Sequence, residues 1–133
     1  GFNEPSGIAA TQDGSKVFVS ESAGHTIRMV EVSTMTLSTL AGSSGTPGSD
    51  DGVSASFYAP TDLAVTPDGL KVLVCDSLNH KIRSVLVADG TTTTLAGSGT
   101  PSVADGTGVE ASFDQPVGIV ITPDGSKAYI AER

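Results

Sequence analysis

Val72-Leu73-Val74-Cys75-Asp76-Ser77-Leu78-Asn79-His80-Lys81-Ile82-Arg83 decides the fold of this chain, because the same pattern also occurs 55 residues earlier. The earlier copy, residues 17–28, reads Val-Phe-Val-Ser-Glu-Ser-Ala-Gly-His-Thr-Ile-Arg. A second motif recurs with the same period: a Phe that is followed three residues later by Pro, at Phe2, Phe57 and Phe113. A fixed period of 55 or 56 residues is typical of a solenoid, a propeller or an array built from one supersecondary unit.

Each copy contains four short runs with the composition of β-strands, separated by Gly, Pro and Asp. In the second copy the runs cover residues 62–66, 71–74, 81–87 and 92–95. The first two runs are apolar on both alternating faces, which predicts sheets that are covered on both sides. We therefore predict an all-β fold with almost no helix, namely a β-propeller of four-stranded antiparallel blades. A parallel β-helix is the alternative, but its coils are shorter than this period, and Asp-Gly turns favour antiparallel hairpins.

The blade repeats are predicted at about residues 2–56, 57–112 and 113–133, and the last of them is incomplete. The chain would then hold two blades and the inner half of a third, about 2.4 blades in all. We expect it to be a piece of a longer protein, because repeats bury their apolar faces against neighbouring repeats. The exposed faces of the end blades should make an isolated chain of this length associate with copies of itself.

Charge and hydropathy argue against several classes of partner. The chain has 15 acidic and 7 basic residues and a net charge of −8, whereas affinity for nucleic acid comes from Lys and Arg that neutralise phosphates. The same charge argues against anionic membrane surfaces, and no apolar run approaches the ~20 residues of a membrane helix. Cys75 is the only cysteine, so no intrachain disulfide can form, and its place in an apolar strand predicts a buried, unreactive thiol.

The spaced motifs together resemble the NHL repeat. They are Phe-x-x-Pro, Thr-Pro-Asp-Gly, the stretch from Val72 to Arg83, and Leu-Ala-Gly at residues 40–42 and 95–97. The resemblance covers essentially the whole chain and implies a propeller, commonly six-bladed, that would need about 330 residues. Members of the family serve as binding platforms, as structural modules and, in a few cases, as lyases or lactonases, so the resemblance implies no single activity. This chain lacks the basic face of the RNA-binding members.

An acid after the second strand, a His in the next hairpin and an Arg in the third strand recur in the copies. We predict structural roles for them. The acid would accept backbone N–H groups or pair with the His or the Arg, and the Arg would form an ion pair within or between blades. A catalytic group is needed only once, so recurrence favours this interpretation. The residues are Glu21, His25 and Arg28 in the first copy and Asp76, His80 and Arg83 in the second.

Metal binding is a weaker hypothesis for two carboxylates. Asp76 belongs to the recurring acids, which could form a ring near one propeller face and hold a cation. Asp62 stands in the first strand, where the other two copies have Gly; a carboxylate there would face the central channel and contact an ion, a polar ligand or only solvent. Asp50-Asp51-Gly52 does not match the EF-hand spacing. We predict no cofactor and no catalytic residue.

Three functions remain open. The regular acidic repeat favours a non-enzymatic scaffold for binding, adhesion or structure, with other proteins, copies of the same protein or glycans as partners. Ser and Thr in the interblade connections and in the run Thr91, Thr92, Thr93, Thr94 predict O-glycosylation and an extracellular or cell-surface location. The alternatives are a channel-metal enzyme of the lyase or lactonase type, and a sensor propeller fused to a signalling domain.

Overall fold

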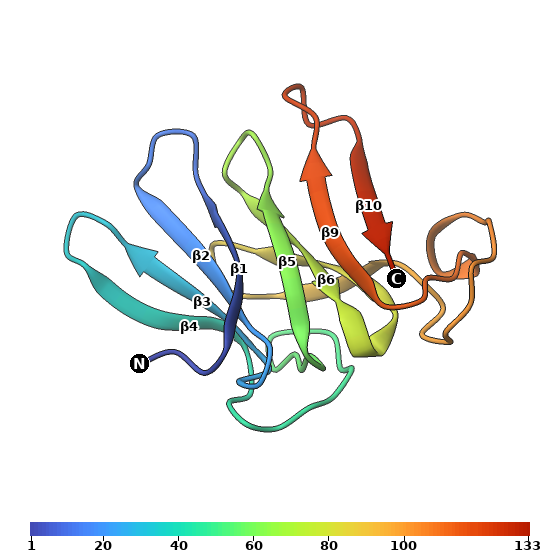
Figure 1. Ribbon diagram of the computed structural model, residues 1–133. Coiled ribbons are helices and arrows are strands. Elements are labelled where there is room, and N and C mark those ends of the chain that lie inside the picture. Colours follow the sequence, from blue (N-terminus) through green and yellow to red (C-terminus); the bar gives the residue numbers. More distant parts are fainter.

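The computed structural model describes residues 1–133 and contains three antiparallel sheets, in each of which every strand pairs with the next along the chain (Figure 1). The first sheet contains β1 (Pro5–Ala10), β2 (Lys16–Glu21), β3 (Thr26–Glu31) and β4 (Thr36–Gly42). The second contains β5 (Pro60–Val65), β6 (Lys71–Asp76), β7 (Lys81–Leu86) and β8 (Thr92–Ala96), and the third contains β9 (Pro116–Ile121) and β10 (Ala128–Glu132). The helices are two single 3₁₀ turns, η1 (Ser77–Asn79) and η2 (Gly108–Glu110). Neither has the length or the apolar character to cross a bilayer.

The predicted all-β propeller of four-stranded antiparallel blades is confirmed. The innermost strand of each blade begins two residues earlier than the sequence pattern indicated, at Pro5, Pro60 and Pro116. Each of these prolines lies next to an irregularity in the pairing with the second strand. Proline has no N–H to donate to the ladder, so the regular register resumes only after a bulge.

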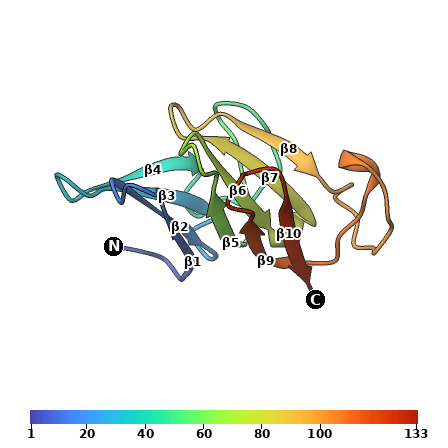
Figure 2. The same ribbon diagram turned by 90° about the horizontal axis from the view of Figure 1, so that it is seen from above.

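The three sheets stand side by side as blades, with one inner strand from each next to the other. β1, β5 and β9 are neighbours, while β4 and β8 lie on the outer side (Figure 2). The inner strands approach so closely that a Cβ added to Gly7 would lie 2.6 Å from the carbonyl oxygen of Thr61. Glycine at this position therefore permits the contact between the first two blades.

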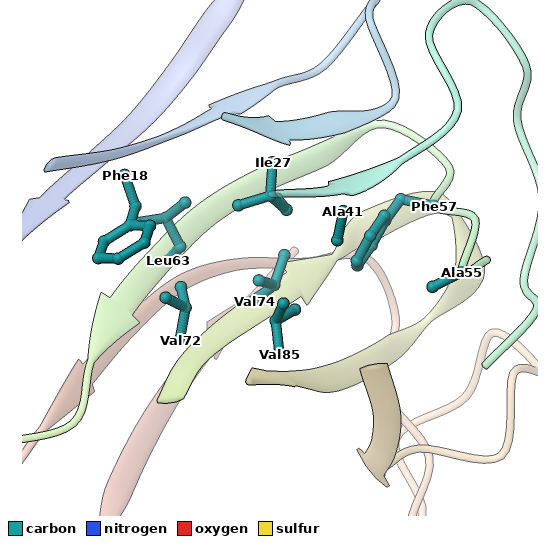
Figure 3. Close-up of a cluster of buried hydrophobic side chains, with 9 residues drawn as sticks. All are labelled: Phe18, Ile27, Ala41, Ala55, Phe57, Leu63, Val72, Val74 and Val85. Carbon is teal, nitrogen blue, oxygen red and sulfur yellow. The ribbon is translucent and has the colours of Figure 1, made fainter. Parts of the chain in front are cut away.

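Two apolar clusters fill the spaces between the blades. The first joins the first and second blades (Figure 3) and consists of Phe18, Ile27, Ala41, Ala55, Phe57, Leu63, Val72, Val74 and Val85. The second joins the second and third blades and consists of Leu73, Cys75, Ile82 and Ile119. Alternate residues of β6 therefore enter different clusters, which explains why this strand is apolar on both faces.

The hairpin turns at the start of the blades carry Asp residues that bind their own turn. Asp124 Oδ1 accepts from the Thr122 hydroxyl at 2.6 Å and from the Ser126 N–H at 3.0 Å. Asp13 Oδ1 accepts from the Ser15 N–H at 2.9 Å and from the Thr11 hydroxyl at 2.7 Å. These hydrogen bonds favour the carboxylate and lower the pKa of both Asp residues from 3.8 to about 2.

We expect the melting temperature to fall as the pH drops from about 4 to about 2. A carboxyl group with a lowered pKa in the fold stabilises it above the unfolded pKa, and this contribution is lost as the pH falls through the folded value. Asp124→Asn should weaken the dependence, because an amide oxygen still accepts from Ser126 but does not titrate. Thermal unfolding followed by circular dichroism at both pH values measures this. Glu110→Gln, at an exposed position of η2, is the control, and an Asp124→Asn curve as steep as the wild type would contradict the prediction.

Candidate functional site

Arg83 lies at the centre of a polar junction between the second blade and the loop that precedes this blade. Its side chain, on β7, is 0% exposed. Nη1 donates to Asp76 Oδ2 at 2.6 Å and to the carbonyl of Ser56 at 3.0 Å. Nη2 donates to Asp51 Oδ1 and to the carbonyl of Asp50, both at 2.7 Å. The planar fork of the guanidinium matches these acceptors, so Arg83 ties the end of β6 and the preceding loop to β7.

The Phe57 ring packs against the Arg83 guanidinium. The Arg83 Cζ lies 5.1 Å from the centroid of the Phe57 ring, within the range of a cation–π contact. Its Nε is buried and has no hydrogen-bond partner. The junction is therefore closed by an aromatic ring on one face, and the charge of Arg83 is balanced by Asp76 and Asp51.

Asp76 ends β6 and is as buried as Arg83. Its Oδ1 accepts from the Tyr58 N–H at 2.8 Å, and its Oδ2 also accepts from the Asn79 amide at 2.8 Å. Burial raises the pKa of the Asp76 carboxyl, and the donors of Asn79, Tyr58 and Arg83 oppose that rise. Both oxygens face donors, which is the arrangement of a structural ion pair.

The first blade repeats part of this junction. Arg28 Nη1 lies 3.3 Å from Glu21 Oε1, and the Arg28 Cζ lies 5.9 Å from the centroid of the Phe2 ring. Glu21 accepts from the Asn3 N–H at 2.9 Å. The Arg28 side chain is 18% exposed, and no residue takes the place of Asp51. The same residue types therefore form a looser junction in the first blade.

The two histidines contact the following blade. His80 has φ 55° and ψ 41°, in the left-handed region, and its Nδ1 accepts from the Gln115 N–H at 3.1 Å. His25 has φ 57°, and its Nδ1 accepts from the Ala59 N–H at 3.1 Å. Each ring thus holds the segment just before the inner strand of the next blade. Asp76 pairs with Arg83 and not with His80, because the Nδ1 of His80 faces Gln115 and Asp114 of the next blade.

Replacing His80 with Val should destabilise the fold by about 2 kcal/mol, because a β-branched residue is strained at positive φ and the Gln115 N–H loses its acceptor. Asn at the same position tolerates the left-handed conformation and loses only the acceptor, so we expect a cost of about 1 kcal/mol. Urea unfolding of the two variants measures the difference. Equal destabilisation by Val and Asn would show that the backbone conformation contributes nothing.

Asp62 also contacts the next blade. Its Oδ2 accepts from the Ile119 N–H at 2.9 Å. The Thr61 hydroxyl donates to the carbonyl of Pro116 at 3.2 Å, and the Ser20 hydroxyl donates to the carbonyl of Thr61 at 2.6 Å. Polar side chains therefore connect the inner strands of neighbouring blades. Within residues 1–133 no three His, Cys, Asp or Glu residues gather in a way that could hold a metal ion.

Burial in the sheet limits the reactivity of the Cys75 thiol and the access of a modifying enzyme to Thr92. Cys75 is 0% exposed, and burial raises its pKa to about 12. Thr92 is buried and its hydroxyl donates to the carbonyl of Gly90 at 3.0 Å. This corrects the prediction of Thr92 as a glycan acceptor, because the folded sheet covers it. Thr93 is exposed, and Thr91 and Thr94 are half-buried.

The two interblade loops lie at the opposite end of the blades from the turns that carry Asp13 and Asp124 (Figure 1). We call residues 43–56 and 97–112 the loop face. It contains no Lys or Arg, and its carboxylates are Asp50, Asp51, Asp105 and Glu110. It also exposes three apolar side chains, Val53, Val103 and Val109.

Sequence reasoning missed the part that the loop face plays in the junction. Asp51 and the carbonyls of Asp50 and Ser56 supply three of the acceptors of Arg83. The available signal was the Asp-Asp-Gly sequence at residues 50–52, which resembles a calcium loop at first sight. The Asp51 carboxylate instead accepts from Arg83 and from Thr94, and the Asp50 carbonyl accepts from Arg83.

Comparisons with known proteins agree with the repeat and with the fold. No family model matches the chain. It is 33% identical to Protein SUPPRESSOR OF QUENCHING 1, chloroplastic, from Arabidopsis thaliana, over 98% of this chain and 13% of the plant protein. It is 35% identical to NHL repeat-containing protein 2 from Homo sapiens, over 99% of this chain and 20% of the human protein. The chain thus spans 13% and 20% of the lengths of these relatives.

A solved structure shows the same arrangement of strands. An auxiliary nutrient binding protein from Bacteroides thetaiotaomicron superposes with a TM-score of 0.80 at 27% identity, over 95% of this chain and 34% of that chain.

Proposed function

Because this chain is an NHL-repeat β-propeller chain by sequence and by fold, we propose that it acts as a non-enzymatic binding scaffold. The observation that carries the proposal is the engagement of the recurring polar residues. In the second blade Asp76, His80 and Arg83 all hold blades or loops together. These contacts engage the recurring titratable side chains in packing and do not leave them free for chemistry.

The loop face is the surface that we propose for partner binding. Its four carboxylates have no Lys or Arg among them, whereas Lys16, Lys71 and Lys127 follow the Asp residues of the opposite turns. Asp51 is paired with Arg83, but Asp50, Asp105 and Glu110 form no ion pair. Their negative charge favours a partner with a basic surface and speeds its association. Exposed Val53, Val103 and Val109 add apolar area, as expected of a protein partner. The binding role in the name of the Bacteroides protein is consistent with this proposal.

Site-specific photo-crosslinking in the full-length protein tests this surface. A photoreactive residue at Val53 or Val109 on the loop face should form crosslinks to a partner protein in the source cells. The matched controls are Met35 and Leu70, which are 74% and 63% exposed and lie away from the loop face. Mass spectrometry identifies the crosslinked proteins. Equal yields from both sides, or crosslinks from Met35 and Leu70 alone, would contradict the proposed surface.

We also propose an extracellular or cell-surface location. Support comes from the Ser- and Thr-rich composition and from exposed Thr93 on β8, which is accessible to O-glycosylation. Mass spectrometry of the native protein should find hexose or N-acetylhexosamine on the peptide that contains Thr93. An unmodified peptide, together with protection of the protein from protease added to intact cells, would place it inside.

The alternative function, a metal-dependent enzyme with its site in the propeller channel, is tested by a different measurement. Elemental analysis of the full-length protein would find calcium or zinc in stoichiometric amount if other blades supplied the ligands. That result, together with hydrolysis of a lactone, would overturn the non-enzymatic role. It would leave the test of the loop face unaffected, because crosslinking reads partner contact and not activity.

A further inference from the structure

A pocket lies between the first and second blades, away from the loop face. It is walled by the turn between β1 and β2, the turn between β5 and β6, and the end of β7 with the two residues that follow it. The first two of these turns lie at the end of the blades opposite the interblade loops (Figure 1). Both blades have all four strands, so both walls are complete. The volume of about 640 Å³ is that of a small-molecule site.

The first apolar residue of the pocket departs from the repeat. Leu70 occupies the position that Ser15 and Ser126 have in the other two copies. The hydroxyls of these serines each donate to the Asp of the same turn at 2.8 Å, whereas Leu70 lines the pocket with a side chain that is 63% exposed. The second copy therefore presents apolar surface here, which an apolar ligand covers more favourably than water does.

A second leucine in the same pocket also departs from the repeat. Leu86 lies opposite Lys71 in the ladder between β6 and β7, whereas the first blade has Glu31 opposite Lys16. The side chains of Glu31 and Lys16 form an ion pair at 3.2 Å. The second blade has an apolar side chain in place of that acid, and it lines the pocket together with Leu70.

The pocket also carries two carboxylates, those of Asp13 and Asp68. Asp68 Oδ1 accepts from the Thr66 hydroxyl at 2.6 Å and from the Leu70 N–H at 3.0 Å, and Asp13 uses its Oδ1 in the same way. Oδ2 of each Asp accepts no hydrogen bond within the chain. The hydrogen bonds lower the pKa of both carboxyl groups, so both are anionic at neutral pH. Lys16 is the only basic residue that lines the pocket, and its ion pair balances its charge.

We propose that this pocket binds a small aliphatic primary amine, whose ammonium group contacts the carboxylates of Asp13 and Asp68. The hydrocarbon chain of the amine lies on Leu70 and Leu86. An ammonium group has three N–H donors, which suit the free carboxylate oxygens. No Phe, Tyr, Trp or His lines the pocket, so it lacks the aromatic faces that bind a quaternary ammonium. The proposal does not depend on the scaffold function, because the pocket shares no residue with the loop face.

Calorimetric titration of the full-length protein with hexylamine tests the proposal. Hexylamine should bind. Hexanoate has a chain of the same length and the opposite charge, and hexyltrimethylammonium has the same charge and no N–H; each should bind at least ~10-fold more weakly. Butylamine should bind at least ~3-fold more weakly than hexylamine, because it covers less apolar surface.

Variants of the two walls give a second measurement. Leu70→Ser introduces the residue of the other two copies and should weaken hexylamine binding by ~5-fold or more. Asp13→Asn keeps an acceptor for its own turn but removes the charge, and should weaken binding by a similar factor. Met35→Ser is the control, because Met35 is 74% exposed and does not line the pocket; it should leave the affinity unchanged. Circular dichroism of each variant checks that the fold is retained.

Equal affinity for hexylamine and hexanoate would overturn the proposal, because the carboxylates would then not select the ligand. The absence of hexylamine binding at millimolar concentration would also overturn it, and so would an unchanged affinity in both Leu70→Ser and Asp13→Asn. A partner protein crosslinked to a photoreactive residue at position 70 would show that a protein, and not a small amine, occupies the pocket.

Discussion

Arg83→Met should lower the free energy of unfolding by about 3–5 kcal/mol, because it leaves the carboxylate of Asp76 buried without its cation. Met has a similar length and fills the space over Phe57, so the cost comes from the lost charge and its hydrogen bonds. The carbonyls of Ser56 and Asp50 lose their donor as well. Asp51 contributes less to the loss, because its side chain is 48% exposed and water can replace the guanidinium.

The first blade supplies a matched control for this substitution. Arg28→Met removes the equivalent side chain, but Arg28 is 18% exposed and lies 3.3 Å from Glu21. Glu21 is buried too, but it keeps the Asn3 N–H and the Thr26 hydroxyl as donors, so we expect a smaller cost of about 1–2 kcal/mol there. Urea unfolding of both variants gives the two free energies. Adding Asp76→Leu to Arg83→Met should restore part of the stability, because no buried charge then remains. Equal costs at Arg83 and Arg28 would show that burial of the junction is not what makes it important.

The fold could be predicted from the sequence because packing in a propeller repeats with the chain. Val72 and Val74 pack toward the first blade, while Leu73 and Cys75 pack toward the third. A strand buried on both sides cannot alternate apolar and polar residues, and this pattern is visible in the sequence of β6 itself. The repeated Asp-Gly turns then indicate the hairpins, because Gly14, Gly69 and Gly125 all adopt positive φ.

The contacts of the junction could not be predicted in the same way. Asp51 reaches Arg83 only because the path of an irregular loop brings it there, and loops have no period from which a position could be inferred. Counted from Leu-Ala-Gly to the Phe of the next repeat, the second interblade loop is one residue longer than the first, so the sequence does not show which of its residues corresponds to Asp51. Asp62 was visible as an exception to Gly, but its acceptor role depends on the N–H of Ile119 in another blade.

Phe57→Ala should cost about 3–5 kcal/mol of unfolding free energy, because the ring is 0% exposed and few neighbours can move into the space it leaves. Phe57 belongs to the cluster between the first and second blades (Figure 3) and also lies under the guanidinium of Arg83. Removing the ring therefore affects the apolar contact and the cation–π contact together. Phe57→Leu should retain most of the stability, since it keeps apolar volume in the same place.

Phe2 occupies the same position of the repeat and serves as the control, because it is 46% exposed. Phe2→Ala should cost about 1 kcal/mol, in proportion to the smaller apolar area that it buries. Combining Phe57→Ala with Arg83→Met should cost less than the sum of the single changes, because the two side chains are in contact. Urea unfolding of the single and double variants gives the coupling energy. A strictly additive result would mean that Phe57 acts only through the apolar cluster and that the ring does nothing for the charge above it.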